Sequence, residues 1–219
     1  MLETEFDSSM PLIDQVKQGK DIKEAVELLN SVGLTEAHLY VKTPYKISNG
    51  QKYRFAVAKL CDSGKPIWVA DEFASTLNPE MAAIVAKGLR KLAFRYGATV
   101  ILAAPHVDYF VDSLLPNKIV KLRWGMQASL YSIKISSFQL KNKDAILNIT
   151  SNGDLTLKGV ETGFIEQNGM FRLESHTEKL APKQTVLVKV KLKVELPDGD
   201  FYGVVVKSRE GVGDVVYWG

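Results

Sequence analysis

The stretch that most constrains the fold is 67–104, where one helix separates two apolar runs. Ile67–Ala70 and Thr99–Ala104 are short runs bounded by turn residues, a pattern typical of buried strands. Between them, Pro79–Tyr96 has the spacing of an amphipathic helix, and Gly97 provides its stop. A strand, a crossover helix and a second strand form a right-handed parallel unit. The sequence therefore predicts an α/β domain.

Two further helices are expected before this unit. Asp21 is a candidate N-cap with Glu24 three positions later, and apolar residues follow at helical spacing until Gly33. The second helix is expected at Ser48–Leu60, with Ser48 or Asn49 near its N-cap. The preceding residues 1–20 show no such pattern and are expected to be an irregular lead.

The pattern of apolar residues changes after about Trp124. Val107–Leu115 and Lys118–Leu122 are expected to be the last helix and the last strand of the α/β part. Beyond them, short alternating runs are separated by Asn-Gly and Asp-Gly turns, which is typical of an antiparallel β-sandwich. The order of these runs resembles an immunoglobulin-like domain. The expected organisation is an α/β part at 21–124 followed by an all-β sandwich at 125–219.

Composition excludes several classes of protein. The net charge of +3 is too small to indicate a nucleic-acid binder, and no apolar run approaches the roughly 20 residues that span a bilayer. The single cysteine, Cys61, excludes an intrachain disulfide. The acidic start of the chain has no apolar core of a signal peptide, so the cytoplasm is the expected location.

A short motif of small polar residues opens the helix that follows Ile47. Its residues are Ser48, Asn49, Gly50 and Gln51. The free N–H groups and the dipole of a helix N-terminus attract anions such as phosphate. An ordinary capped helix after a turn would have the same residues, so this motif alone leaves both interpretations open.

Polar residues also follow the two strands of the parallel unit. Asp71 and Glu72 end the first strand, and His106 comes shortly after the second. Because parallel strands point their carboxyl ends at the ligand crevice, these side chains are candidates for catalysis and metal binding. Solvated acids and a loop histidine are the simpler alternatives. Asn78, just before Pro79, is either a helix cap or part of the same site.

Taken together and in order, these motifs resemble the second half of an ABC-type ATPase nucleotide-binding domain. The resemblance covers about residues 24–122 and comprises the signature loop, the Walker B strand, the D-loop and the switch histidine. Two positions depart from the family pattern. Asn49 replaces the first glycine of the signature, and Asn78 replaces the aspartate of the D-loop.

The resemblance implies a role for each motif. It implies that residues 48–51 contact the γ-phosphate of ATP and that Asp71 organises Mg²⁺. It also implies that Glu72 polarises the attacking water and that His106 hydrogen-bonds the γ-phosphate. Asn78 would then take part in contacts between subunits.

The phosphate-cradling loop of this family is missing. The closest match, Asp14–Asp21, lacks the first glycine and the final hydroxyl, and no apolar strand precedes it. The expectation is therefore that the P-loop comes from a partner protein, from a second copy of a longer chain or from an upstream segment missing here. Completion by a partner or a second copy would give a homo- or heterodimer. The SMC-like relatives separate the two motif sets in a similar way. The sequence around Asp21–Tyr53 and Trp68–Phe73 most resembles archaeal ABC-type ATPases linked to an acetyltransferase-like domain.

An alternative hypothesis is a scaffold that has lost catalysis and binds another protein through its β-sandwich. An aromatic group near the C-terminus could serve such binding or could pack in the core: Phe201, Tyr202, Tyr217 and Trp218. The other two histidines, His38 and His176, have no partners that suggest ligation.

Overall fold

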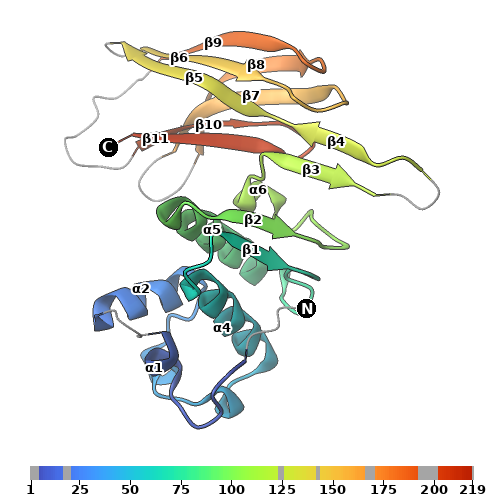
Figure 1. Ribbon diagram of the computed structural model, residues 1–219. Coiled ribbons are helices and arrows are strands. Elements are labelled where there is room, and N and C mark those ends of the chain that lie inside the picture. Colours follow the sequence, from blue (N-terminus) through green and yellow to red (C-terminus); the bar gives the residue numbers. More distant parts are fainter. Residues whose placement is uncertain are drawn as a thin grey trace. The chain divides into compact units, whose positions relative to one another are not determined.

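The computed structural model describes residues 5–16, 21–122, 126–141, 144–165, 171–191 and 202–218 (Figure 1). The chain divides into two compact units, Met1–Leu114 and Leu115–Gly219. This boundary precedes the one expected near residue 124. The reason is that β3 (Lys118–Lys121), expected as the last strand of the α/β part, pairs antiparallel with β4 (Ser129–Ser132) of the second unit.

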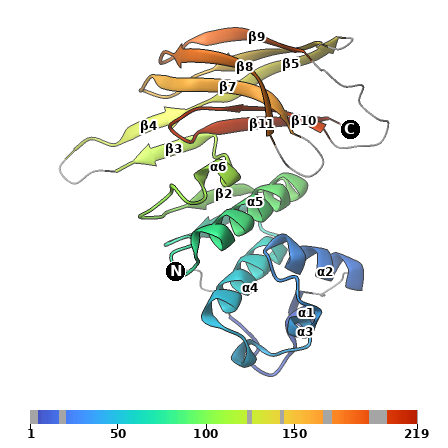
Figure 2. The same ribbon diagram turned by 180° about the vertical axis from the view of Figure 1, so that it is seen from behind.

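The helices of the first unit largely follow the sequence pattern (Figures 1 and 2). They are α1 (Leu12–Val16), α2 (Ile22–Ser31), α3 (Ala37–Tyr40), the 3₁₀ turn η1 (Pro44–Lys46), α4 (Asn49–Asp62), α5 (Pro79–Tyr96) and α6 (Val111–Leu114). The expectation that residues 1–20 are irregular is wrong for α1. Leu12 and Val16 are fully buried, so apolar packing holds this short helix against the unit. The helix expected at Val107–Leu115 is shortened to α6.

Local capping fixes the ends of the longer helices. The Asp21 carboxylate accepts a hydrogen bond from the Glu24 N–H at 2.7 Å, which caps α2 as expected. Helix α5 begins and ends at the expected residues. Asn78 caps its start, and Gly97 ends it with a left-handed φ of 62°.

Two short strands form the sheet of the first unit. β1 (Ile67–Ala70) and β2 (Thr99–Leu102) pair in parallel, with Ile67 opposite Thr99 and Ala70 opposite Leu102. With α5 as the crossover, this confirms the predicted parallel unit. Within the described residues, this sheet has two strands.

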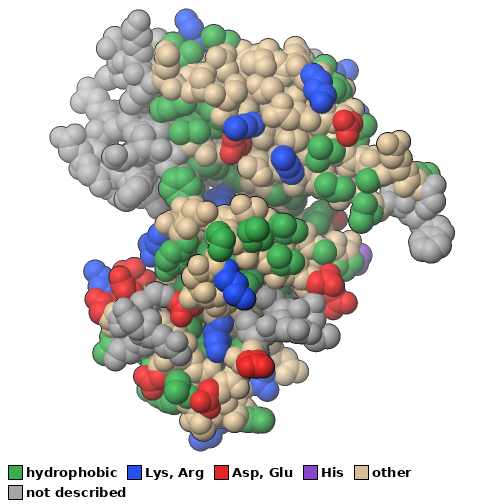
Figure 3. Space-filling model, in the orientation of Figure 1, with side chains coloured by type: hydrophobic (Ala, Val, Ile, Leu, Met, Phe, Trp, Pro, Cys, Tyr) green, Lys and Arg blue, Asp and Glu red, His purple; other side chains and the backbone are tan. Residues whose placement is uncertain are grey.

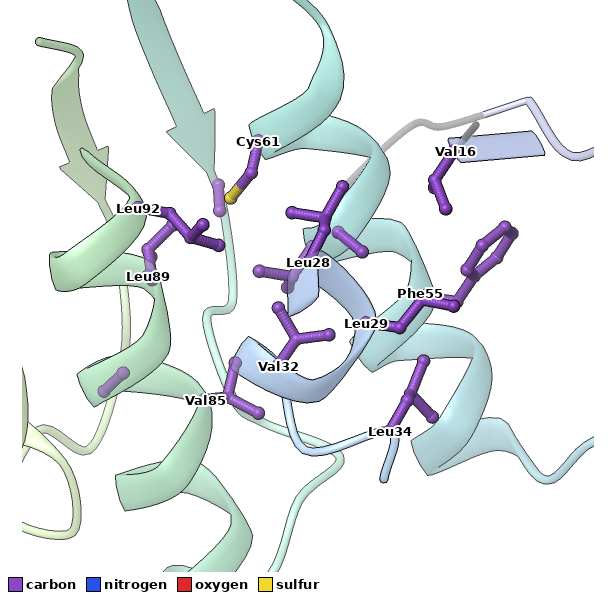
Figure 4. Packing of buried hydrophobic residues seen from close by; sticks show 14 of the residues in the cluster. Val16, Leu28, Leu29, Val32, Leu34, Phe55, Cys61, Val85, Leu89 and Leu92 are labelled. Carbon is purple, nitrogen blue, oxygen red and sulfur yellow. The ribbon is translucent and has the colours of Figure 1, made fainter. Parts of the chain in front are cut away.

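One apolar cluster holds the helices and the sheet of the first unit together (Figure 4). Leu28, Leu29, Phe55, Leu89 and Leu92 lie in it, and each is at least 98% buried. Helices α2 and α5 approach so closely that a Cβ at Gly88 would overlap the carbonyl oxygen of Ser31. The close approach explains a glycine in the middle of α5, where a larger residue would otherwise favour the helix.

The second unit consists of antiparallel sheets. Its remaining strands are β5 (Lys134–Lys141), β6 (Asp144–Thr150), β7 (Leu157–Ile165), β8 (Phe171–Leu180), β9 (Thr185–Lys191), β10 (Tyr202–Lys207) and β11 (Gly213–Trp218). They form a four-stranded sheet of order β11-β10-β7-β8 and a three-stranded sheet of order β5-β6-β9. Both sheets contribute to one buried cluster, for example Leu147 from β6 and Val204 from β10.

Candidate functional site

The N-terminus of α4 is built by a reciprocal capping box. The Ser48 hydroxyl accepts a hydrogen bond from the Gln51 N–H at 3.3 Å, and the Gln51 side-chain oxygen accepts one from the Ser48 N–H at 2.9 Å. Asn49 and Gly50 occupy the first two helical positions, where N–H groups have no acceptor within the helix. The arrangement therefore leaves two N–H groups available to an anion.

Gly50 is not required by the backbone or by packing. It lies within the helical turn, and a Cβ added to it would be 3.6 Å from Leu77 Cδ2, an ordinary contact distance. The helix geometry and the packing of this turn therefore give no reason for a glycine at position 50. The same contact places the start of α4 beside the loop that precedes α5.

The chain makes a tight turn directly after β1. Asp71 and Glu72 are both exposed, and the Asp71 carboxylate accepts a hydrogen bond from the Glu72 N–H at 2.9 Å. Glu72 has a φ of 49° and Ala74 a φ of 62°, both in the left-handed region that residues other than glycine seldom adopt. Two overlapping turns follow, with Ser75 N–H donating to the Glu72 carbonyl and Leu77 N–H to that of Ala74. Such backbone strain is concentrated at functional sites in proteins.

Phe73 anchors this turn to the neighbouring strand and to the core. Its N–H donates to the Ala103 carbonyl at 2.9 Å, just beyond the end of β2. Its buried ring packs edge-on against Phe110 at 5.0 Å and against Tyr53 at 6.3 Å between centroids. The position of the two exposed acids is therefore fixed by a buried neighbour.

Tyr53 joins α4 to the same turn. Its hydroxyl accepts a hydrogen bond from the Ala74 N–H at 2.7 Å, and burial raises the pKa of Tyr53 to about 12. From the sequence alone, Tyr53 is predicted only to be one apolar position of a helix. No local pattern identifies the contact, because the partner lies 21 positions away.

Arg54 supports the start of α4 from the other side. Its Nε donates to the Gly50 carbonyl at 3.3 Å, and its Nη1 donates to the carbonyl of Gly33 at the end of α2. Partial burial lowers the pKa of Arg54, while Glu36 opposes this effect. The guanidinium thus links the motif helix to the preceding helical segment.

His106 lies exposed in the loop after β2. Because β1 and β2 are parallel, His106 and Asp71 follow the same end of the sheet. The Ala103 N–H donates to the Ala70 carbonyl at 2.9 Å, which holds the first residues of the two loops together. The acids and the histidine therefore come from neighbouring loops, as the sequence predicted.

Asn78 has a defined structural task. Its side-chain oxygen accepts a hydrogen bond from the Met81 N–H at 2.8 Å and caps α5 ahead of Pro79. Asn78 therefore acts as a helix cap, which was one of its two predicted roles. The residue is exposed, so its amide can also make a further contact.

Metal-ligand clusters and hollows bear on what the site can bind alone. In the part of the chain that the structure describes, no three histidine, cysteine or acidic side chains cluster to hold a metal ion. A shallow hollow of about 250 Å³ lies near the start of α4, and Phe6, Ser8, Pro44, Tyr45 and Lys52 line it, none of them a predicted site residue. Among the described helices, none is long and apolar enough to cross a bilayer.

Comparison with known proteins supports the ATPase resemblance over part of the chain. The phosphonates import ATP-binding protein PhnC of Hydrogenovibrio crunogenus is 36% identical over 106 residues, which is 48% of this chain and 38% of PhnC. The methionine import ATP-binding protein MetN of Streptococcus mutans is 24% identical over 89% of this chain and 51% of MetN. The chain thus spans about half or less of the length of these relatives. About half of it is homologous to ATP-binding components of importers.

A dimeric bacterial ABC transporter cassette is a structural neighbour, with a TM-score of 0.45 and 22% identity over 53% of this chain and 54% of the cassette. No family model matches the sequence. The homology to ATP-binding proteins does not favour the alternative of a scaffold. The resemblances to the acetyltransferase-linked subfamily and to immunoglobulin-like domains stay predictions.

Proposed function

We propose that residues 21–124 are the signature and Walker B half of an ABC-type ATPase, and that a P-loop outside this chain completes its ATP site. One observation carries the proposal: the Tyr53 hydroxyl on α4 accepts a hydrogen bond from the Ala74 N–H in the turn that bears the acids. The motifs that would meet ATP in such an enzyme are therefore linked to one another within the first unit.

The start of α4 supplies groups for the γ-phosphate. The Ser48 hydroxyl, the side chains of Asn49 and Gln51, and the unpaired N–H groups of the first turn lie at the positive end of a 14-residue helix. Gly50 adds no side chain to this turn. These residues would bind and orient phosphate oxygens, which fits an anion that carries several charges.

The acids and the histidine supply the remaining chemistry. Asp71 would hold Mg²⁺, an ion that in proteins is commonly bound through one or two carboxylates together with waters and substrate phosphates. Bound Mg²⁺ would neutralise charge on the phosphates. Glu72 would accept a hydrogen bond from the attacking water, and His106 would donate one to the γ-phosphate.

The other parts of the proposal follow from these assignments. Asn78 would contact the partner through the part of its amide that does not cap α5. The second unit is proposed to be an immunoglobulin-like β-sandwich, supported by two antiparallel sheets that share one core. The homology to import ATP-binding proteins supports a cytoplasmic location and assembly as a dimer.

The test uses a defined source of the missing half. The probe is the segment of H. crunogenus PhnC that precedes its match to this chain. ATP hydrolysis with Mg²⁺ is measured for the full chain, for the probe and for their mixture. We expect ATP turnover only in the mixture. In that mixture, Glu72→Gln should lower the turnover rate at least about 100-fold. The matched control is Glu80→Gln, an exposed acid in the first turn of α5, which should leave turnover unchanged.

Two results would contradict the proposal. Submillimolar binding of Mg²⁺–ATP by the chain alone, with turnover abolished by Glu72→Gln, would mean that this chain has its own phosphate cradle. Equal turnover for Glu72→Gln and the unchanged chain in the mixture would remove Glu72 from catalysis.

A further inference from the structure

The hollow near the start of α4 is formed by three parts of the first unit. Phe6 and Ser8 come from the segment before α1, Pro44 and Tyr45 from η1, and Lys52 from α4. Its volume of about 250 Å³ is below the range of about 300–1,000 Å³ that is typical of sites for drug-sized ligands. The hollow therefore suits a small molecule, such as a single ring with a short substituent.

The segment before α1, which forms one wall of the hollow, is held in place by a buried glutamine. Gln15 is 5% exposed, and its side-chain oxygen accepts a hydrogen bond from the Asp7 N–H at 3.1 Å. Its Nε2 donates to the carbonyls of Asp7 and Met10, both at 2.9 Å. Lys59 on α4 adds a bond from its Nζ to the Glu5 carbonyl at 2.7 Å. This wall is therefore fixed before a ligand binds, which lowers the entropic cost of binding.

Aromatic and apolar side chains form most of the lining. The ring of Phe6 lies 5.4 Å from that of Phe55, a fully buried residue of the core. Pro44 is buried as well, whereas the adjacent Tyr45 is 77% exposed. Most of the Tyr45 side chain thus faces solvent and is available to cover a ligand. Aromatic faces of this kind pack well against a planar ring.

Three polar groups line the same hollow: the hydroxyls of Ser8 and Tyr45 and the ammonium group of Lys52. Among the residues that the structure describes, the side chains of all three have no hydrogen bond and no ion pair. Asp7 does not serve them, because its carboxylate accepts hydrogen bonds from the N–H and the hydroxyl of Ser9 at 2.8 and 2.7 Å. These groups are therefore available to a ligand.

The charge in the lining is positive and local. Among the described side chains on the face drawn in Figure 3, acidic and basic groups are interspersed over the helices of the first unit, without a broad field of one sign. The charge of a ligand in the hollow is therefore met chiefly by Lys52. An anion would gain a charge-assisted hydrogen bond there, whereas a cation would meet a like charge.

We propose that this hollow binds a small aromatic carboxylate. The ring of the ligand packs between Phe6 and Tyr45, and its carboxylate accepts hydrogen bonds from the Lys52 ammonium group and the Ser8 hydroxyl. A nucleotide is too large for the hollow, and inorganic phosphate would leave the aromatic walls unused. This binding site is separate from the proposed ATP site, since the two share no residue, and it does not depend on the proposed function.

Saturation-transfer NMR on the full chain at pH 7.5 tests the binding site, with phenylacetate as the probe and no nucleotide present. Acetate carries the charge without the ring, and 2-phenylethanol carries the ring without the charge. We expect phenylacetate to bind at least about tenfold more tightly than either, because it alone uses both halves of the lining. Equal affinity for acetate or for 2-phenylethanol would overturn the proposal.

Variants locate the probe on the chain. Lys52→Gln should weaken phenylacetate binding at least about tenfold, and Tyr45→Ala, at an exposed side chain, should also weaken it. The matched control is Lys46→Gln, which removes an exposed lysine of η1 outside the lining and should leave the affinity unchanged. Equal losses at positions 46 and 52 would indicate only a general effect of charge. Unchanged binding in both Lys52→Gln and Tyr45→Ala would place the probe elsewhere. Either result would overturn the proposal.

Discussion

The hydroxyl of Tyr53 on α4 and the N–H of Ala74 after β1 form a 2.7 Å hydrogen bond, which ties the motif helix to the turn bearing Asp71 and Glu72. Ala74 is buried and has a left-handed φ. The bond therefore satisfies a donor that water could not easily reach, at a position where the backbone is strained.

Tyr53→Phe removes the acceptor and leaves the ring. We expect the free energy of unfolding to fall by about 1–3 kcal/mol, because the Ala74 N–H loses its partner while buried. Urea unfolding at pH 7 measures the change. Tyr45→Phe is the control, since Tyr45 is 77% exposed and should change stability little. A loss at position 53 no larger than at position 45 would contradict the structural role of the bond.

The buried hydroxyl of Tyr53 also predicts how the stability of the chain depends on pH. The pKa of Tyr53 is raised to about 12 in the folded chain, whereas an unfolded tyrosine has a pKa near 10. Above pH 10 the unfolded state releases this proton first, so the stability of the wild type should fall as pH rises toward 12. Tyr53→Phe should show a shallower fall, because the other ionisations are common to both proteins. Parallel stability curves between pH 9 and pH 11.5 would contradict the burial of the hydroxyl.

Two helical glycines should respond oppositely to alanine. Gly88→Ala forces a methyl group into the Ser31 carbonyl and should destabilise the chain by about 1–3 kcal/mol or more. Gly50→Ala meets only an ordinary contact and should leave stability equal or raise it by up to about 1 kcal/mol. Thermal and urea unfolding of both variants and of the unchanged chain measure these differences in stability.

The Gly50 variant also separates stability from function. In the mixture with the PhnC probe, Gly50→Ala should lower turnover, because the methyl group obstructs the approach of phosphate to the first turn of α4. Unchanged turnover would show that the ligand does not approach this surface.

Asn78 tests capping independently of catalysis. Asn78→Ala should lower the free energy of unfolding by about 1 kcal/mol, since the Met81 N–H loses its cap. Asn78→Asp should retain full stability, because a carboxylate accepts the same bond and suits the positive end of the helix. Urea unfolding of both variants checks this, and equal losses would remove the cap as the explanation.

The sequence predicted best those elements whose ends are marked by local chemistry. Helix α5 was predicted to the residue because Asn78-Pro79 begins it and Gly97 ends it. The N-cap of α4 was predicted at Ser48 or Asn49, and the structure has it at Ser48. These signals act within one helical turn, so no tertiary knowledge is needed to interpret them.

Features that depend on distant partners could not be predicted in this way. The run Ile67–Ala70 is apolar throughout, so nothing in it distinguishes the covered side chains from the exposed ones. The Tyr53–Ala74 bond joins residues on different elements. Strand β3 follows the α/β part in sequence but pairs with β4, because pairing is decided by the ladder it joins and not by its own composition.

The half-covered sheet of β1 and β2 also has a consequence for the abundance of this protein in a cell. Among the described residues, aliphatic side chains on this sheet are exposed and its two strands have backbone outside the ladder, features that promote aggregation and recognition by chaperones and proteases. Copies in which this sheet stays uncovered should therefore be cleared faster than copies in which it is covered. The amount of the chain that accumulates in a cell would then depend on how much of this surface is buried there.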